Sequence, residues 1–138
     1  MLHIWLPSVF KRLEDLARLC RARMGALGAW IEDKNSGTIL LQHAVARGMS
    51  ARPIHSILTS VGKDGRGISV STYVEQDKVK YSEYAFNKIT IYKQQSRNHL
   101  LDQVESFRIG DKNSTREDDL LDTFCYGIAI ALGNSEGV

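Results

Sequence analysis

The sequence has few residues of the kinds that build covalent or metal-bound frameworks. Its two cysteines, Cys20 and Cys125, stand far apart and belong to no CxxC or Cys/His spacing. They are therefore expected to be reduced thiols, and a structural zinc site is not expected. The four histidines are isolated in the sequence. No GxxxxGK[ST] phosphate loop occurs, so the chain lacks the sequence signature of a P-loop ATPase.

Long apolar runs and a strong charge of one sign are also missing. The apolar stretch 120–132 contains Asp122 and is too short to cross a bilayer, so a buried core helix is expected there. No basic segment followed by a long apolar stretch opens the chain, which predicts no signal peptide and a cytoplasmic location. The net charge of +2 is too small to identify a nucleic-acid partner. A length of 138 residues predicts one domain, 1–138, with one core.

Helical patterns alternate with short apolar runs along the chain. This alternation predicts an α/β domain with a largely parallel sheet. Strands are expected at 2–6, at the buried run that ends with Ile31, at 53–58 and at 77–81. Helices are expected after Ser8, at 38–46, from about 66 to 76, at 97–108 and from the acidic cluster at 117–122 onwards.

The first acidic cluster follows the apolar run that ends at Ile31. Glu32 and Asp33 stand directly after this run, and a helical pattern begins after Gly37. Open α/β sheets place their ligand sites at the carboxyl ends of their strands. Because successive strand residues point to opposite faces, Glu32 is the stronger site candidate and Asp33 the weaker.

The second acidic cluster, EDDLLD at 117–122, opens the last helical pattern. At about 100° per residue, Asp118, Asp119 and Asp122 project into one sector of that helix. Favourable interaction of acids with a helix N-terminus accounts for Glu117 and Asp118. It does not account for Asp122, which precedes an apolar stretch and needs either a partner or an ion. Two separated groups of carboxylates suggest a site for a hard divalent cation.

These motifs resemble those of the nuclease domain of the large terminase subunit of tailed bacteriophages. IEDKNSGTILLQ resembles the second acidic motif of that family, and REDDLLDTFCYGIAIAL resembles its final acidic helix. Three further segments occur in the order and spacing that the family shows, so the resemblance extends over residues 2–134. They are GKDGR at 62–66, YVEQDKVKY at 73–81 and RNHLLDQVESF at 97–107.

The resemblance implies an RNase H-like fold and two-metal-ion cleavage of double-stranded DNA during genome packaging. Two Mg²⁺ or Mn²⁺ ions would activate the attacking water and stabilise the leaving oxygen. Carried over by position, Glu32 would bridge the ions, Asp119 would be a further ligand, and Asp122 or Asp118 would complete or support the site. The family also implies an ATPase motor domain, a small terminase subunit and a portal as partners.

Two basic residues, Lys63 and Arg66, flank a glycine in the segment KDGR. They are candidates for contacts with DNA phosphates. The alternative is that both belong to a solvated loop.

The sequence departs from the family at its beginning. Such nucleases take a first metal-binding aspartate from their first strand, whereas no Asp precedes Asp15 here and LHIWLP resembles a later strand. The chain therefore resembles a terminase cut inside its nuclease domain, with an RNase H-like sheet that lacks its first strand or strands. A truncated prophage gene, one piece of a split gene and a deliberately shortened polypeptide all fit this pattern. We expect weak or absent cleavage and self-association through the exposed sheet edge.

Two other interpretations remain open from the sequence. One is a non-catalytic prophage remnant that keeps the fold and binds DNA or a packaging protein. The other is a resolvase-like nuclease of the same fold, whose last helix can also carry spaced acids.

Overall fold

The computed structural model describes residues 11–12, 14–16, 18–22, 25, 28–111 and 117–133. The chain divides into two compact units, Met1–His55 and Ser56–Val138. The described residues between 11 and 22 are helical, in agreement with the helix expected after Ser8. The strand expected at 2–6 lies outside the described residues. Together the two units form a mixed α/β protein, which confirms the fold class at this coarse level.

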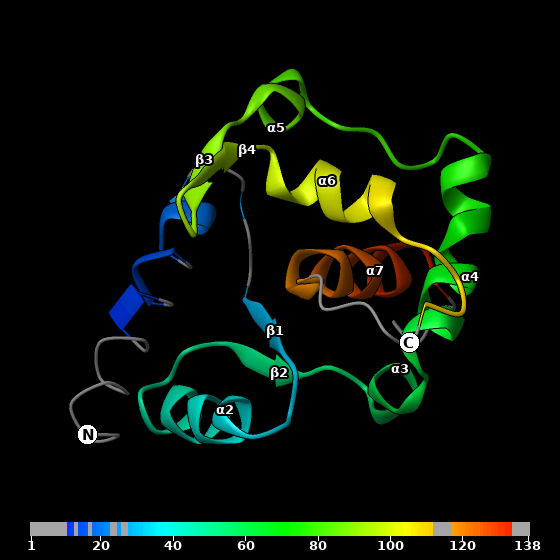
Figure 1. Ribbon diagram of the computed structural model, residues 1–138. Coiled ribbons are helices and arrows are strands. Elements are labelled where there is room, and N and C mark those ends of the chain that lie inside the picture. Colours follow the sequence, from blue (N-terminus) through cyan, green and yellow to red (C-terminus); the bar gives the residue numbers. More distant parts are fainter. Residues whose placement is uncertain are drawn as a thin grey trace. The chain divides into compact units, whose positions relative to one another are not determined.

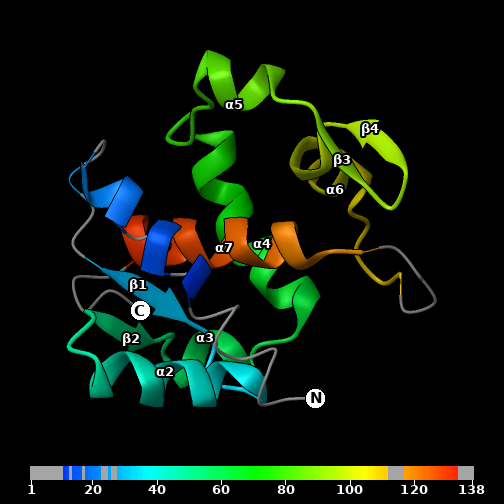
Figure 2. The same ribbon diagram turned by 90° about the vertical axis from the view of Figure 1, so that its left-hand side faces the viewer.

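The first unit contains a short strand–helix–strand arrangement. Strand β1 (Ala29–Ile31) is followed by helix α2 (Ser36–Ala46) and by strand β2 (Ala51–Pro53), which pairs with β1 in parallel (Figures 1 and 2). Arg47 is the C-cap residue of helix α2, and Gly48 follows it with a positive φ of 68° that favours glycine. The predicted strand end at Ile31 and the predicted helix are thereby confirmed.

The turn in the IEDKNSG motif requires a glycine at position 37, because the backbone packs closely there. A Cβ atom at this position would lie 1.9 Å from the backbone oxygen of Glu32. The same turn is closed by the Gly37 N–H, which donates to the Lys34 carbonyl at 2.9 Å, and by the Lys34 N–H, which donates to the Glu32 carbonyl at 2.9 Å. Glycine thus allows the start of α2 to fold back onto the residue that follows β1.

The second unit is mainly helical (Figure 1). It comprises α3 (Ser56–Ser60), α4 (Lys63–Glu75), α5 (Glu83–Asn87), β3 (Thr90–Tyr92), β4 (Gln95–Arg97), α6 (His99–Ser106) and α7 (Asp119–Leu132). Helix α7 packs against α4 and α6. Their core is formed by Val70 of α4 and by Leu121, Cys125 and Ile128 of α7. The buried helix expected at the end of the chain is confirmed.

The prediction of a largely parallel sheet is wrong for the described residues. They form two separate two-stranded sheets, β1–β2 parallel and β3–β4 antiparallel. The β1 strand is also less buried than expected, because Trp30 is 45% exposed. Alternation of helices and apolar runs therefore indicated the class of the protein but not how its strands pair.

Two predicted strands were placed wrongly. Within the segment 53–58, strand β2 ends at Pro53 and helix α3 begins at Ser56. The segment 77–81 is irregular, because Asp77 adopts a positive φ of 58° and its N–H closes the end of α4 on the Val74 carbonyl. The Tyr81 ring then stacks on Phe124 of α7 at 6.0 Å between ring centres.

Helix α6 begins at a side chain that also holds α5. The carboxamide oxygen of Asn98 accepts from the Leu101 N–H at 3.2 Å, which caps the helix. Its nitrogen donates to the carbonyls of Ala85 and Phe86 at 2.8 and 3.0 Å. The predicted 97–108 helix is confirmed in a shorter form, since Arg97 belongs to β4.

Candidate functional site

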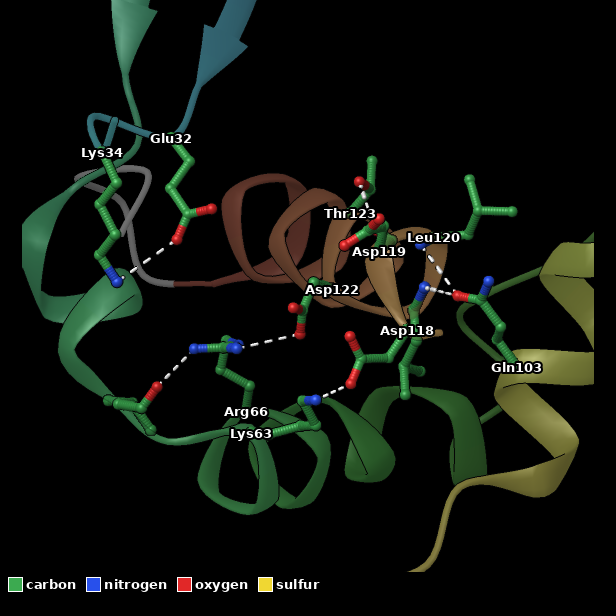
Figure 3. A network of polar contacts seen from close by, with 12 residues as sticks. Glu32, Lys34, Lys63, Arg66, Gln103, Asp118, Asp119, Leu120, Asp122 and Thr123 are labelled. Carbon is green, nitrogen blue, oxygen red and sulfur yellow. Dashed lines mark hydrogen bonds and ion pairs between the residues drawn. The ribbon is translucent and has the colours of Figure 1, made fainter. Parts of the chain in front are cut away.

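The three candidate aspartates of the last helix lie in its first turn and at its N-cap. Asp118 is the N-cap residue, yet its side chain makes no capping hydrogen bond. The Gln103 side-chain oxygen, from α6, accepts instead from the Leu120 and Leu121 N–H groups at 2.9 and 3.0 Å (Figure 3). Because Gln103 satisfies these backbone donors, the Asp118 carboxylate is available for another interaction.

Asp122 forms a partly buried ion pair with Arg66 of α4. The Arg66 Nη2 lies 2.9 Å from the Asp122 Oδ1. The Arg66 side chain is only 13% exposed and the Asp122 side chain 27%. The Arg66 Nη1 also donates to the Val61 carbonyl, and the guanidinium carbon lies 5.1 Å from the centre of the Tyr126 ring. The sequence required a partner or an ion for Asp122, and the structure supplies Arg66 (Figure 3).

Lys63 forms the equivalent pair with Asp118. The two side chains, 45% and 28% exposed, meet one turn earlier along both helices (Figure 3). Asp119 differs from its neighbours, because it is exposed and forms no ion pair with another described residue. Two of the three α7 aspartates are thus paired with cations of α4, whereas the exposed Asp119 is paired with no cation of the part of the chain that the structure describes.

A hollow of about 410 Å³ lies beside the start of α7. Both carboxylates and cations line it, among them Lys63, Asp64, Arg108, Asp111, Glu117 and Asp118. Of the three α7 aspartates only Asp118 lines it, and the carboxylate of Asp64 is already used, since it accepts from the Gly110 N–H at 3.0 Å. The α7 aspartates therefore do not converge on this hollow.

Glu32 lies where the sequence predicted, directly after β1, and belongs to the first unit. Its carboxylate is 3.4 Å from the Lys34 ammonium and 43% exposed. The neighbouring Asp33 accepts from the Thr38 hydroxyl at 2.7 Å, which connects it to the first turn of α2. Asp33 therefore has a local structural role.

The described residues show no ready-made metal centre. Within neither unit do three or more described His, Cys, Asp or Glu side chains form a group that could hold a metal ion. The four candidate ligands belong to different units, with Glu32 in the first and the three aspartates in the second. The Mg²⁺ or Mn²⁺ site thus stays a prediction from sequence.

The sequence reasoning missed the main contacts of this region. Lys63 and Arg66 were predicted as phosphate contacts, but both are engaged with α7 aspartates. A signal for this existed in the spacing: two cations three apart match two acids four apart, and both spacings place residues on one helix face. No sequence signal pointed to Gln103 as the cap of α7.

Burial also affects the one thiol of this core. The pKa of Cys125 is raised above its ordinary value of 9.0, mainly by burial and further by the nearby Asp122 carboxylate, while Arg66 opposes the shift. Cys125 is therefore an inert core residue rather than a nucleophile.

Comparisons of the chain with protein-family models, curated proteins and solved structures gave no match. Among the described residues, no helix has both the length and the apolar character that a membrane span requires.

Proposed function

We propose that this chain is part of a metal-dependent DNA endonuclease of the terminase type, with an RNase H-like fold, whose own cleavage activity is weak. The proposal joins the two acidic motifs of the sequence to one structural observation. That observation is the neutralisation of Asp118 and Asp122 by Lys63 and Arg66.

The support for nuclease ancestry lies in the placement of the carboxylates. Glu32 follows a strand of a parallel pair, the position where α/β proteins bind their ligands. Asp119 is exposed at the start of a helix whose next turn is buried in the core. The start of α7 thereby presents an exposed carboxylate that pairs with no described cation, and carboxylate oxygen is a ligand that hard metal ions take.

The support for weak activity lies in the two ion pairs. A divalent ion that used Asp118 or Asp122 would have to displace an ammonium or a guanidinium group. The Arg66 pair is largely withdrawn from water, and removing one partner of such a pair leaves the other charge without compensation. Metal binding and catalysis both depend on the charge at these positions.

The second candidate function is a non-catalytic module of the same fold that binds DNA or a packaging protein. The same ion pairs favour it, because they give Asp118 and Asp122 a structural role that needs no metal. Double-stranded DNA is the partner under the endonuclease proposal, and the ATPase motor domain, small terminase subunit and portal are partners implied by the family.

Nicking and linearisation of supercoiled plasmid by the purified chain, in Mn²⁺ and in Mg²⁺, tests the proposal. The variants are Glu32→Ala and Asp119→Ala, and Glu83→Gln, an exposed carboxylate of α5, is the control. We expect slow cleavage that EDTA stops, that both alanine variants lose and that the control keeps. Cleavage that survives both alanine substitutions would contradict the assigned site. Absence of cleavage in every version would favour the binding module.

A further inference from the structure

The start of α7 has two residues that can accept from the same backbone donors. Asp118 is the N-cap residue, and an N-cap side chain ordinarily accepts from the N–H of the second or third residue of its helix. In α7 these residues are Leu120 and Leu121, and both N–H groups donate instead to the Gln103 side-chain oxygen, at 2.9 and 3.0 Å. Gln103 belongs to α6, so the cap of α7 comes from another helix.

The backbone of Asp118 agrees with this division of roles. Ser82 and Asn98 are N-cap residues of the same unit whose side chains do cap, and their backbones are extended, with ψ of 152° and 93°. Asp118 has a ψ of 12° and makes no side-chain cap. Because side-chain capping normally needs the extended conformation, the Asp118 carboxylate is kept away from the N–H groups of its own helix.

The Asp118 carboxylate is used by α4 instead. It pairs with the Lys63 ammonium, whereas Gln103 reaches the backbone of α7 from α6 (Figure 3). A carboxylate is at least as good an N-cap acceptor as an amide oxygen, and its charge interacts favourably with a helix N-terminus. Asp118 is therefore suited to take over the cap if Gln103 is removed.

We propose that Gln103 is a positioning residue, which holds the Asp118 carboxylate outside the cap of α7 and directed toward α4. With Gln103 in place both capping donors are occupied, and Asp118 pairs with Lys63. Without Gln103, Asp118 rotates to an extended ψ, caps α7 itself and leaves Lys63. This positioning needs neither metal nor DNA. Its meaning for cleavage rests on the proposed function, in which Asp118 is a candidate metal ligand.

A merely structural cap would behave differently from a positioning residue. If Gln103 did no more than cap α7, its removal would cost the same whether or not residue 118 carries a carboxylate. If the two side chains share the donors, Asp118 compensates for the loss of Gln103, and the full cost appears only when both are gone. The sign of the coupling between the two positions therefore separates the two roles.

Urea unfolding of the full chain measures this coupling in Gln103→Met, Asp118→Ala and the double variant. Methionine keeps the length of glutamine without a strong acceptor, and alanine cannot cap. We expect Gln103→Met to raise the unfolding equilibrium constant at least about threefold more in the Asp118→Ala background than in wild type, as for the loss of a cap. Gln76→Met is the control, because Gln76 is an exposed glutamine at the end of α4; its effect should be the same in both backgrounds.

NMR of the same variants gives a readout that a structural cap alone would not change. The ¹³Cα and ¹³Cβ shifts of residue 118 report its backbone conformation, and in Gln103→Met they should move toward the values of an extended backbone. Gln103→Glu keeps an acceptor oxygen of the same reach and should leave these shifts as in wild type.

The outcomes distinguish this role of Gln103 from the proposed function. Equal costs of Gln103→Met in both backgrounds, unchanged shifts at residue 118, or a Gln103→Met chain that does not fold would each overturn the positioning role, because Asp118 would not have compensated. In Mn²⁺ titrations, any affinity that Lys63→Met gains should be lost when Gln103→Met is added. If no version binds Mn²⁺, the metal role in the proposed function is contradicted, while the unfolding cycle and the shifts still decide the role of Gln103.

Discussion

Arg66 of α4 and Asp122 of α7 form the most buried ion pair found among the described residues, at 2.9 Å between Nη2 and Oδ1. The two residues lie far apart in sequence, and the hydrogen bonds of the guanidinium reach both Asp122 and the Val61 carbonyl. The pair therefore connects α7 to α4 and to the turn that precedes α4.

Arg66→Met should lower the free energy of unfolding by about 1–3 kcal/mol, because Asp122 would keep its charge without a partner. Urea unfolding followed by circular dichroism measures the loss. Lys80→Met is the control, since Lys80 and Asp77 form a pair that is 73% and 82% exposed and should cost about 0–1 kcal/mol. Adding Asp122→Leu to Arg66→Met should recover part of the loss. Equal effects of the Arg66 and Lys80 substitutions would contradict the structural role assigned to Arg66.

Lys63→Met should strengthen the binding of Mn²⁺, because it releases the Asp118 carboxylate beside the exposed carboxylate of Asp119. A gain on the order of fivefold corresponds to about 1 kcal/mol. Isothermal titration with Mn²⁺ measures it, with Lys80→Met again as the control. If wild type and Lys63→Met both fail to bind Mn²⁺ at millimolar concentration, the metal role of the α7 aspartates is wrong.

Gly37→Ala should destabilise the first unit, although alanine is the better helix former. The added Cβ would lie 1.9 Å from the Glu32 oxygen, and the turn must open to relieve the clash at a cost of about 1–3 kcal/mol. Gly127→Ala is the matched control in α7, because apart from its chain neighbours and the backbone of its own helix no described atom lies within 4 Å of its Cβ position. That substitution should stabilise by about 0.5–1 kcal/mol. Urea unfolding of both variants measures the contrast, and a gain in stability from Gly37→Ala would refute the packing argument.

The Cys125 thiol should make the protein less stable in alkaline solution. Because the pKa of Cys125 is higher in the folded state than its ordinary value of 9.0, the folded protein binds the proton more tightly. The stability that this proton contributes is fully present below the ordinary pKa of 9.0. It is lost as the pH rises from that value through the higher pKa of the folded state. Unfolding free energies measured between about pH 7 and 10 should fall more steeply in wild type than in Cys125→Ala. Parallel curves would contradict the effect, and Cys20→Ala serves as the control for the loss of a thiol.

Local sequence pattern predicted four of the labelled helices, and the apolar spacing was clearest for the segments that form α6 and α7. Helices α2, α4, α6 and α7 were all expected near their observed positions. Strands were harder to predict, since a three-residue strand such as β1 or β3 is too short to show an alternating pattern. The pairing of these strands depends on contacts between distant segments, which periodicity does not contain.

The candidate site shows a similar division. The sequence showed that Asp122 needed compensation, because its neighbours along the helix are apolar. It did not show that the compensation was Arg66, since two segments 56 residues apart meet only when α4 packs on α7. The role of Gln103 depends on the packing of α6 beside α7 in the same way. The sequence therefore predicted which side chain needed a partner, but it did not predict which residue that partner would be.

The paired charges of α4 and α7 also determine how the two helices are aligned along their axes. Their apolar contacts, through Val70, Leu121, Cys125 and Ile128, could regroup if one helix slid past the other by one turn, about 5.4 Å. Such a slide would separate Lys63 from Asp118 and Arg66 from Asp122 together. The two ion pairs thus fix the axial register of α4 against α7. They favour one alignment over the others that apolar contacts alone would allow.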